Sequence, residues 1–178
     1  MKRNNLITRI LQVSLLLVCA GFISCNRGGA GHMAEQQDSV SQGDKPAFGD
    51  AKVSAVYDQY IHLKNALVNS DLEEAQSGAA GLETALSDAG NKAGAELSGR
   101  VAGSSSLDDQ RAGLDILTAE VEKVIKSAKL EHGRIYKQYC PMAQNGKGAY
   151  WLSSEQDIKN PYYGNEMLEC GEVKEEIK

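Results

Sequence analysis

The side chains with the clearest chemical potential are four sulfur-bearing residues near the C-terminal end. Cys140 and Met142 lie two residues apart, Met167 and Cys170 lie three apart, and all four fall within one short window. Residues two apart on a strand project to the same face, and residues three apart are adjacent on a helical turn or tight loop. If the chain brings the two pairs together, two thiolates and two thioethers form a ligand set that favours Cu(I) over hard ions.

The same cysteines have a structural alternative. In an oxidising compartment, Cys140 and Cys170 can form a disulfide that closes a loop of about 30 residues and stabilises the fold by roughly 3–4 kcal/mol. The methionines would then fill gaps in the core. Copper capture by a reduced pair and oxidation to a disulfide can also be alternative states of one site, so both remain open. His132, which precedes the first predicted C-terminal strand, can add an imidazole ligand.

No other group of residues points to catalysis. The sequence has no serine, histidine and aspartate at an activating spacing, no glycine-rich phosphate loop after a strand, and no His-Glu-x-x-His helix. We therefore expect that the protein is not an enzyme. Glu172, Glu175 and Glu176 near the C-terminus can attract cations, but a solvated tail is the favoured explanation.

Aromatic residues gather in the same region as the sulfur atoms. Five of the seven tyrosines and the single tryptophan fall between Tyr136 and Tyr163. The adjacent pairs Tyr150-Trp151 and Tyr162-Tyr163 form either the aromatic core of a small cap or a docking surface for another protein.

The N-terminal segment has the layout of a secretory signal peptide. Residues 1–24 combine a basic end with an apolar run at 11–23 that is short for a membrane span. The end of this segment, Phe22-Ile23-Ser24-Cys25, resembles the lipobox of bacterial lipoproteins, in which the cysteine receives diacylglycerol and becomes the mature N-terminus. This resemblance predicts a lipid anchor at Cys25. The alternative is ordinary cleavage near this point, with Cys25 left as a free thiol.

The charge balance argues against a nucleic-acid partner. The 178 residues include 19 Lys and Arg against 24 Asp and Glu, giving a net charge of −5, and there is no Lys/Arg-rich run. Removal of residues 1–24 would take away three positive charges and Cys19, leaving a net charge of about −8. With Cys25 lipidated, Cys140 and Cys170 would be the two remaining side-chain thiols.

The middle of the chain predicts a tether followed by helices. Residues 25–50 are rich in Gly, Ser, Gln and Asp and have the composition of a flexible linker. Apolar residues recur at three and four positions from Val53 to about Asn69, which predicts an amphipathic helix. Ser70-Asp-Leu-Glu73 has the spacing of a capping box for a second helix. Gly78 and Gly81 within that helix indicate either close helix packing, which we expect, or a weak stretch of helix.

A further helix and a change of character follow. The pattern of residues 88–106, mostly Ala, Gly and Ser, fits a poor helix or a loop, whereas Ser106 caps a stronger helix that ends near 129–133. After Gly133, β-prone runs at 135–142 and 149–153 flank Asn145-Gly146, which predicts a hairpin. The predicted fold is mainly α. It is an up-and-down three- or four-helix bundle over 51–178 with a small C-terminal β-hairpin and loop cap at 134–178.

Several C-terminal motifs resemble an uncharacterised Gram-negative periplasmic domain family. The motifs are Tyr139-Cys-Pro-Met-Ala143, Gly146-Lys-Gly-Ala-Tyr-Trp-Leu-Ser153, Asn160-Pro-Tyr-Tyr-Gly164 and Met167-Leu-Glu-Cys-Gly-Glu-Val173. The resemblance extends over about residues 53–178, with the helical half matching in pattern alone. The family occurs on lipoproteins and at the C-terminal end of membrane-fusion subunits of copper/silver and cobalt/zinc/cadmium efflux pumps. The resemblance thus implies a periplasmic, membrane-anchored protein with a heavy-metal efflux adaptor as partner.

The segment Tyr139-Cys140-Pro141-Met142 is also similar to the Tyr-x-Cys-Pro-Met-His-Pro motif of heavy-metal-binding modules. Here Ala143 stands where that motif has histidine, which removes a nitrogen ligand. Together these features predict a periplasmic lipoprotein that binds Cu(I) or Ag(I) through Cys140, Met142, Met167 and Cys170 as an accessory to heavy-metal efflux or resistance. The alternative is a non-catalytic interaction module with a structural Cys140–Cys170 disulfide that docks on an efflux adaptor or another envelope protein.

Overall fold

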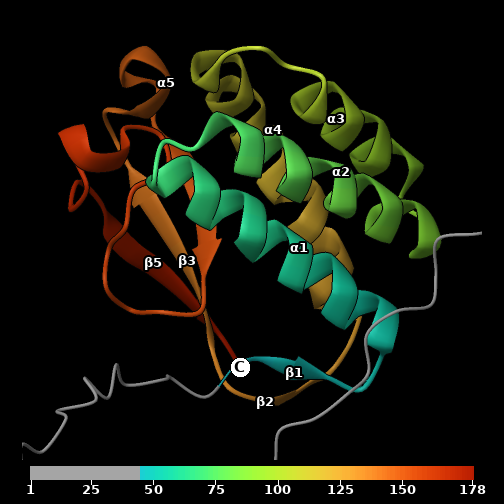
Figure 1. The fold of residues 1–178 in the computed structure, drawn as a ribbon. Helices are drawn as coiled ribbons and strands as arrows, with labels where there is room; N and C mark the ends of the chain where they lie inside the picture. The colour runs from blue at the N-terminus through green and yellow to red at the C-terminus, as the bar shows by residue number, and fades with distance from the viewer. Residues whose placement is uncertain (1–44) are drawn as a thin grey trace, which may run out of the picture. The chain divides into compact units, whose positions relative to one another are not determined.

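The computed structural model describes residues 45–178 (Figure 1). The predicted signal peptide, Cys25 and most of the predicted tether lie outside these residues. Within 45–178 the chain is mainly α-helical, as expected, with two small antiparallel sheets. Among the helices in this part of the chain, none has the length and apolar character needed to cross a membrane.

Four helices make up the N-terminal part of the domain, and each begins at a side chain that accepts a backbone N–H. The helices are α1 (Ala51–Val68), α2 (Leu72–Asp88), α3 (Lys92–Ala102) and α4 (Leu107–Lys126). Their N-cap residues are Asp50, Asp71, Asn91 and Ser106. These caps satisfy N–H groups that have no partner within the helix, so the starts of the helices are set locally.

The cap of α2 differs from the predicted one. The capping-box spacing pointed to Ser70, but the Asp71 carboxylate accepts the Glu74 N–H at 3.0 Å. Ser70 instead has a left-handed backbone, with φ of 55°, and its hydroxyl accepts a hydrogen bond from Arg111 at 2.9 Å. The expectation was wrong by one residue because aspartate is as good a cap as serine, and Arg111 on α4 engages the serine.

The segment at 88–106, whose state the sequence left open, contains helix α3. Its buried positions are small residues, namely Gly94, Ala95, Ser98 and Val101. Ser98 donates a hydrogen bond to the Ala79 carbonyl of α2 at 2.8 Å. The small side chains allow α3 to pack closely on α2, and they also explain why no stripe of large apolar residues marks this helix.

The C-terminal part forms a sheet with one strand more than the predicted hairpin. Its strands are β3 (Ile135–Cys140), β4 (Ala149–Ser153) and β5 (Glu172–Ile177), in the order β4-β3-β5. The β3–β4 hairpin is confirmed, with Cys140 opposite Ala149. Between these two strands lies a short turn, α5 (Ala143–Gly146), in which Gln144 and Asn145 adopt left-handed φ/ψ angles. Sequence patterns missed β5 because four of its six residues are charged and exposed.

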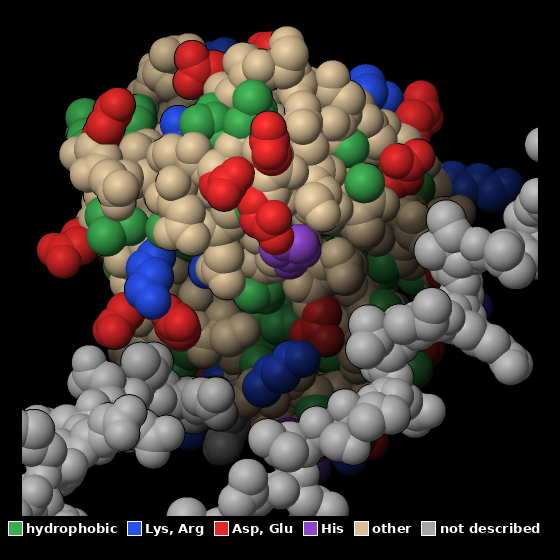
Figure 2. Space-filling view, viewed as in Figure 1, with side chains coloured by type: hydrophobic (Ala, Val, Ile, Leu, Met, Phe, Trp, Pro, Cys, Tyr) green, Lys and Arg blue, Asp and Glu red, His purple; other side chains and the backbone are tan. Residues whose placement is uncertain are grey.

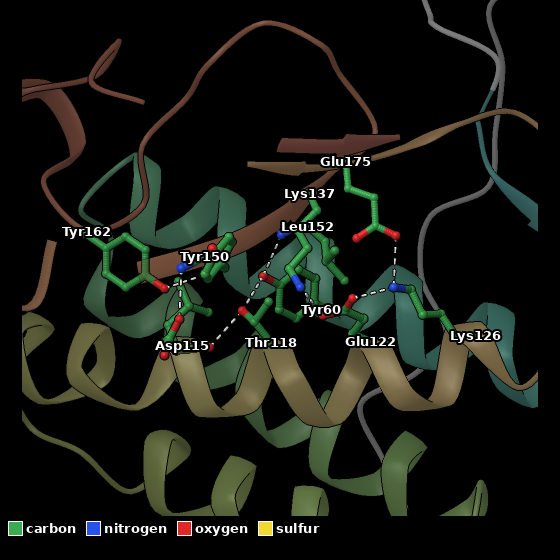
Figure 3. A network of polar contacts seen from close by, with 11 residues as sticks. Tyr60, Asp115, Thr118, Glu122, Lys126, Lys137, Tyr150, Leu152, Tyr162 and Glu175 are labelled. Carbon is green, nitrogen blue, oxygen red and sulfur yellow. Dashed lines mark hydrogen bonds and ion pairs between the residues drawn. The ribbon is translucent and has the colours of Figure 1, made fainter. Parts of the chain in front are cut away.

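The carboxylates of β5 are paired rather than part of a free tail. Glu175 bonds Lys126 at 3.0 Å, and Glu176 bonds Arg134 at 3.2 Å. Lys126 and Lys137 also reach Glu122 of α4, each at 2.7 Å (Figure 3). Burial alone would raise the pKa of Glu122, but the two lysine hydrogen bonds outweigh it and lower the pKa. This ion-pair network joins α4 to β3 and β5.

Side chains close the outer edge of β4. Asp115 accepts the Tyr150 N–H at 2.8 Å, and the Tyr60 hydroxyl accepts the Leu152 N–H at 3.0 Å. Tyr162 donates its hydroxyl to the Tyr150 carbonyl at 2.6 Å. Figure 3 shows these contacts converging on β4 above α4. Unpaired edge groups invite pairing with other chains, and these three side chains use them internally.

A second pair of strands lies near the N-terminal end of β3. Strand β1 (Ala47–Phe48) pairs with β2 (Leu130–His132), and Phe48 is buried in the core. Figure 1 shows β1 and β2 beside the start of α1. Residues 47 and 48 fall within the range expected as tether, and they are part of the folded domain.

The surface agrees with the acidic composition. On the face shown in Figure 2, a group of acidic side chains lies beside a histidine, and hydrophobic side chains reach the surface in small separate patches. The fully buried side chains instead include Trp151, Tyr57, Tyr60 and leucines from α1, α2 and α4. The core thus joins the helices and the sheet in one packed unit.

Candidate functional site

Cys140 and Cys170 meet in the folded domain. Cys140 is the last residue of β3 and is fully buried, whereas Cys170 lies two residues before β5 and is partly exposed. Their Sγ atoms are 3.1 Å apart. The pairing of β5 with β3 produces this meeting, because it places Glu172 opposite Tyr139.

Asn160 holds the backbone that carries Cys170. Its side-chain amide donates to the Cys170 carbonyl at 2.8 Å, and its backbone N–H donates to the Leu168 carbonyl at 2.8 Å. The Asn160 side-chain oxygen in turn accepts the Tyr162 N–H at 2.8 Å. Asn160 is itself fully buried, so these bonds are protected from water and define the path of the loop.

Gly171 allows the loop to pass close to the sheet. Its φ is +151°, and a Cβ at this position would lie 2.8 Å from the Trp151 ring and 3.0 Å from the Tyr139 carbonyl oxygen. A residue with a side chain would therefore push Cys170 away from Cys140. Sequence reasoning missed the roles of Asn160 and Gly171, although both lie in the motifs that carry the family resemblance.

The distance between the two sulfur atoms is compatible with either disulfide formation or metal binding. A disulfide joins its sulfurs at about 2.05 Å. Two of the four sulfur ligands of a tetrahedral zinc site, each at about 2.3 Å from the ion, lie about 3.8 Å apart. From the separation of 3.1 Å, either state needs a shift of no more than about 1 Å.

The proton on Cys170 is held more firmly than in a free thiol. Its hydrogen bond with Cys140, followed by burial and the nearby Cys140 charge, raises the pKa of Cys170. Metal ions and disulfides react with the thiolate, so both reactions must first remove this proton. Both are expected to become more favourable as the pH rises.

The other predicted metal ligands differ in their exposure and in their place in the fold. Met142 is 53% exposed in the turn after β3, and Met167 is partly buried at the end of η1 (Gly164–Glu166). His132 is exposed on β2, at the opposite end of β3 from Cys140. Across residues 45–178, no group of three or more His, Cys, Asp and Glu side chains is arranged to hold a metal. The thiols of Cys140 and Cys170 are the predicted ligands whose direct contact the structure shows.

The predicted docking aromatics divide into buried and accessible residues. Trp151 is fully buried and Tyr162 is 6% exposed, so both belong to the core and neither is available to a partner. Tyr150 is 38% exposed and packs against Tyr139 with ring centroids 4.7 Å apart and ring planes tilted by 42°. Tyr163 is partly exposed and donates its hydroxyl to the Met142 carbonyl at 2.6 Å. The loop at 154–170 packs over Trp151, so of the two expected roles the aromatic core applies to Trp151 and Tyr162.

Comparison with known families identifies part of the helical region. Residues 56–133 match a family model described as "Protein of unknown function (DUF3347)". The match runs from α1 through β2 and stops before β3, so it excludes Cys140 and Cys170. This supports the resemblance to an uncharacterised domain, while the association with lipoproteins and efflux subunits stays a prediction. No curated protein and no solved structure matches the chain.

Proposed function

We propose that this protein binds a soft monovalent ion, Cu(I) or Ag(I), at Cys140 and Cys170 as an accessory to heavy-metal efflux or resistance in the bacterial envelope. The observation that carries the proposal is the contact between the two Sγ atoms at 3.1 Å. Thiolates are soft ligands that select Cu(I) over hard cations. The ion is cargo, to be passed to an efflux adaptor, rather than a resident cofactor.

The arrangement of the pair suits capture and release. Cys140 sits on the central strand β3, which is paired on both sides, whereas Cys170 sits on a loop held mainly through Asn160. A rigid ligand and a more movable ligand allow the pair to open slightly around an ion. Met142 is close to Cys140 in sequence and exposed, so its thioether is suited to the first encounter with an incoming ion.

We expect the reduced full chain, purified in detergent, to bind roughly one Cu(I) per chain against a competing Cu(I) chelator. The variant Cys140→Ser/Cys170→Ser should lose this binding. The two proteins have identical N-terminal segments, processed or not, so any contribution from Cys19 and Cys25 cancels in the comparison. Equal Cu(I) affinity of the two proteins would refute the proposal.

A matched thioether variant separates the roles of the two ligand types. Met142→Leu/Met167→Leu keeps the apolar volume and removes both thioether sulfurs. If the methionines assist capture, this variant should bind Cu(I) more weakly than the parent protein but more tightly than the double serine variant.

A second function is favoured by the burial of Cys140 and by the exposed side chains nearby. In it, the pair is a permanent disulfide and the protein is a non-catalytic interaction module that docks on an efflux adaptor or another envelope protein. Ile116, Met142 and Tyr150 are the exposed large hydrophobic residues among those described.

Mass spectrometry of the non-reduced protein from its native envelope distinguishes the two functions. A complete Cys140–Cys170 disulfide that resists reduction under native conditions favours docking. A disulfide that is readily reduced, or a pair of free thiols, favours metal capture.

A further inference from the structure

The two thiols of the pair differ in how far solvent can reach them. Cys140 is 0% exposed and its neighbours in the hairpin, Ala143 and Ala149, are also buried. Cys170 is partly exposed and is flanked by the exposed carboxylates of Glu169 and Glu172. An external reagent of ordinary size can therefore reach Cys170 in the native protein, while Cys140 becomes reachable only after local opening.

We propose that the pair is a thiol–disulfide exchange site with divided roles, in which Cys170 reacts with an external disulfide and Cys140 resolves the product. The partner is a disulfide-bearing molecule, either a small disulfide or the redox cysteines of an envelope oxidoreductase. The biological role of this exchange rests on the proposed metal site. Oxidation of the pair leaves no thiolate to bind an ion, so it would stop metal capture. The exchange chemistry itself rests on the geometry of the two thiols and needs no metal.

The reaction balances in two steps. In the first, the Cys170 thiolate attacks one sulfur of the external disulfide. A mixed disulfide forms on Cys170, the external S–S bond breaks, and one external thiolate leaves and takes up a proton. In the second, the Cys140 thiolate attacks Cys170 Sγ, forming the Cys140–Cys170 bond and releasing the second external thiolate. The two cysteines are oxidised, and the external disulfide is reduced to two thiols.

The second step is favoured by position. The Cys140 and Cys170 sulfurs are already in contact at 3.1 Å, and the attacking residue lies on a strand that is paired on both sides. An intramolecular attack from a fixed contact outcompetes a second external molecule. The mixed disulfide should therefore be short-lived in the wild-type protein and stable when Cys140 is replaced.

The local charges guide the choice of probe. The exposed carboxylates of Glu169 and Glu172 disfavour an anionic disulfide, so we choose cystamine, which carries two positive charges.

The experiment treats the reduced full chain with cystamine in native buffer without metal, quenches with acid, and maps adducts to the peptides of Cys140 and Cys170. Wild type should gain an internal Cys140–Cys170 disulfide with little mixed adduct. Cys140→Ser should accumulate the cysteamine adduct on Cys170. Cys170→Ser should leave Cys140 modified roughly a hundredfold more slowly than Cys170 is in the first variant, because access requires local opening. In denaturant, the two single variants should react at similar rates.

A second measurement uses the wild-type protein alone, so its result does not depend on how the variants fold. Brief treatment of the reduced wild type with limiting iodoacetamide should label Cys170 before Cys140. The proposal is overturned if Cys140 is labelled as fast as Cys170 in the folded wild type, or if the mixed adduct persists without closing. A protein that exchanges as predicted but does not bind Cu(I) disproves the metal function alone, and one that binds Cu(I) without exchange disproves this inference alone.

Discussion

Replacing Lys64 with methionine is expected to stabilise the protein by about 3 kcal/mol at pH 7, a gain that disappears above about pH 10. Lys64 lies on α1 with 2% of its surface exposed. Burial lowers its pKa from 10.5 to about 8, and the nearby charges of Glu155 and Lys159 act in opposite directions. Methionine keeps an unbranched side chain of similar length, so the main change is removal of the buried ammonium group.

The sign of the pH dependence follows from proton binding in the two states. Below about pH 8, Lys64 is protonated in both states, and the folded state carries the full cost of burying the charge. As the pH rises from 8 towards 10.5, the folded protein releases this proton while the unfolded chain keeps it, so the free energy of unfolding increases with pH. A shift from 10.5 to about 8 corresponds to about 3 kcal/mol, at about 1.4 kcal/mol per pH unit.

Urea unfolding of the wild type and Lys64→Met, followed by circular dichroism at intervals between pH 6 and 10 with reductant present, measures this difference. The exposed Lys92 provides a matched control, since Lys92→Met removes a lysine without relieving burial. We expect Lys92→Met to change the free energy of unfolding by no more than about 0.5 kcal/mol. A constant stability difference between the wild type and Lys64→Met across this range would contradict a buried charge at position 64.

The Gly78→Ala variant is expected to lose about 2–3 kcal/mol of stability, although alanine is the better helix former. Gly78 lies on α2 against α1. A Cβ there would lie 2.8 Å from the Leu63 backbone nitrogen and 2.9 Å from the Leu63 Cα. Backbone atoms of a packed helix cannot move aside individually, so α1 and α2 would have to separate. The strain should outweigh the gain of about 1 kcal/mol in helix propensity.

Gly81, one turn further along the same helix, is the matched control. A Cβ at this position would meet the end of the Gln59 side chain, which is free to take another rotamer. Gly81→Ala should therefore be neutral or stabilise the protein by up to about 1 kcal/mol. Opposite signs for the two substitutions in thermal or urea unfolding would support close packing at Gly78. Equal effects would contradict it.

Local sequence signals predicted the parts of the fold that depend on short-range physics. Periodic apolar residues and the Ser106 cap predicted α1 and α4, because hydrogen bonds and side-chain faces repeat within a few residues. The β3–β4 hairpin was predicted for the same reason, from two β-prone runs around Asn145-Gly146. Local signals did not predict helix α3, because its buried residues are small, or strand β5, because its residues are largely charged.

The candidate site shows the same division. The sequence identified the types of the four sulfur residues and their spacing, which are enough to name the chemistry. It could not show that Trp151 and Tyr162 are core residues, since their burial depends on a loop that folds over the sheet. Nor could it show that His132 and Cys140 lie at opposite ends of β3.

By itself, the sequence determined an acidic chain with locally capped helices, a hairpin and soft ligands at its C-terminal end. The tertiary structure decided which ligands meet. Cys140 and Cys170 are 30 residues apart, and they come into contact because β5 pairs with the far edge of β3 while Asn160 and Gly171 bring the intervening loop close to the sheet. Such long-range pairing depends on cooperative packing of the whole domain, so no local pattern in the chain encodes it.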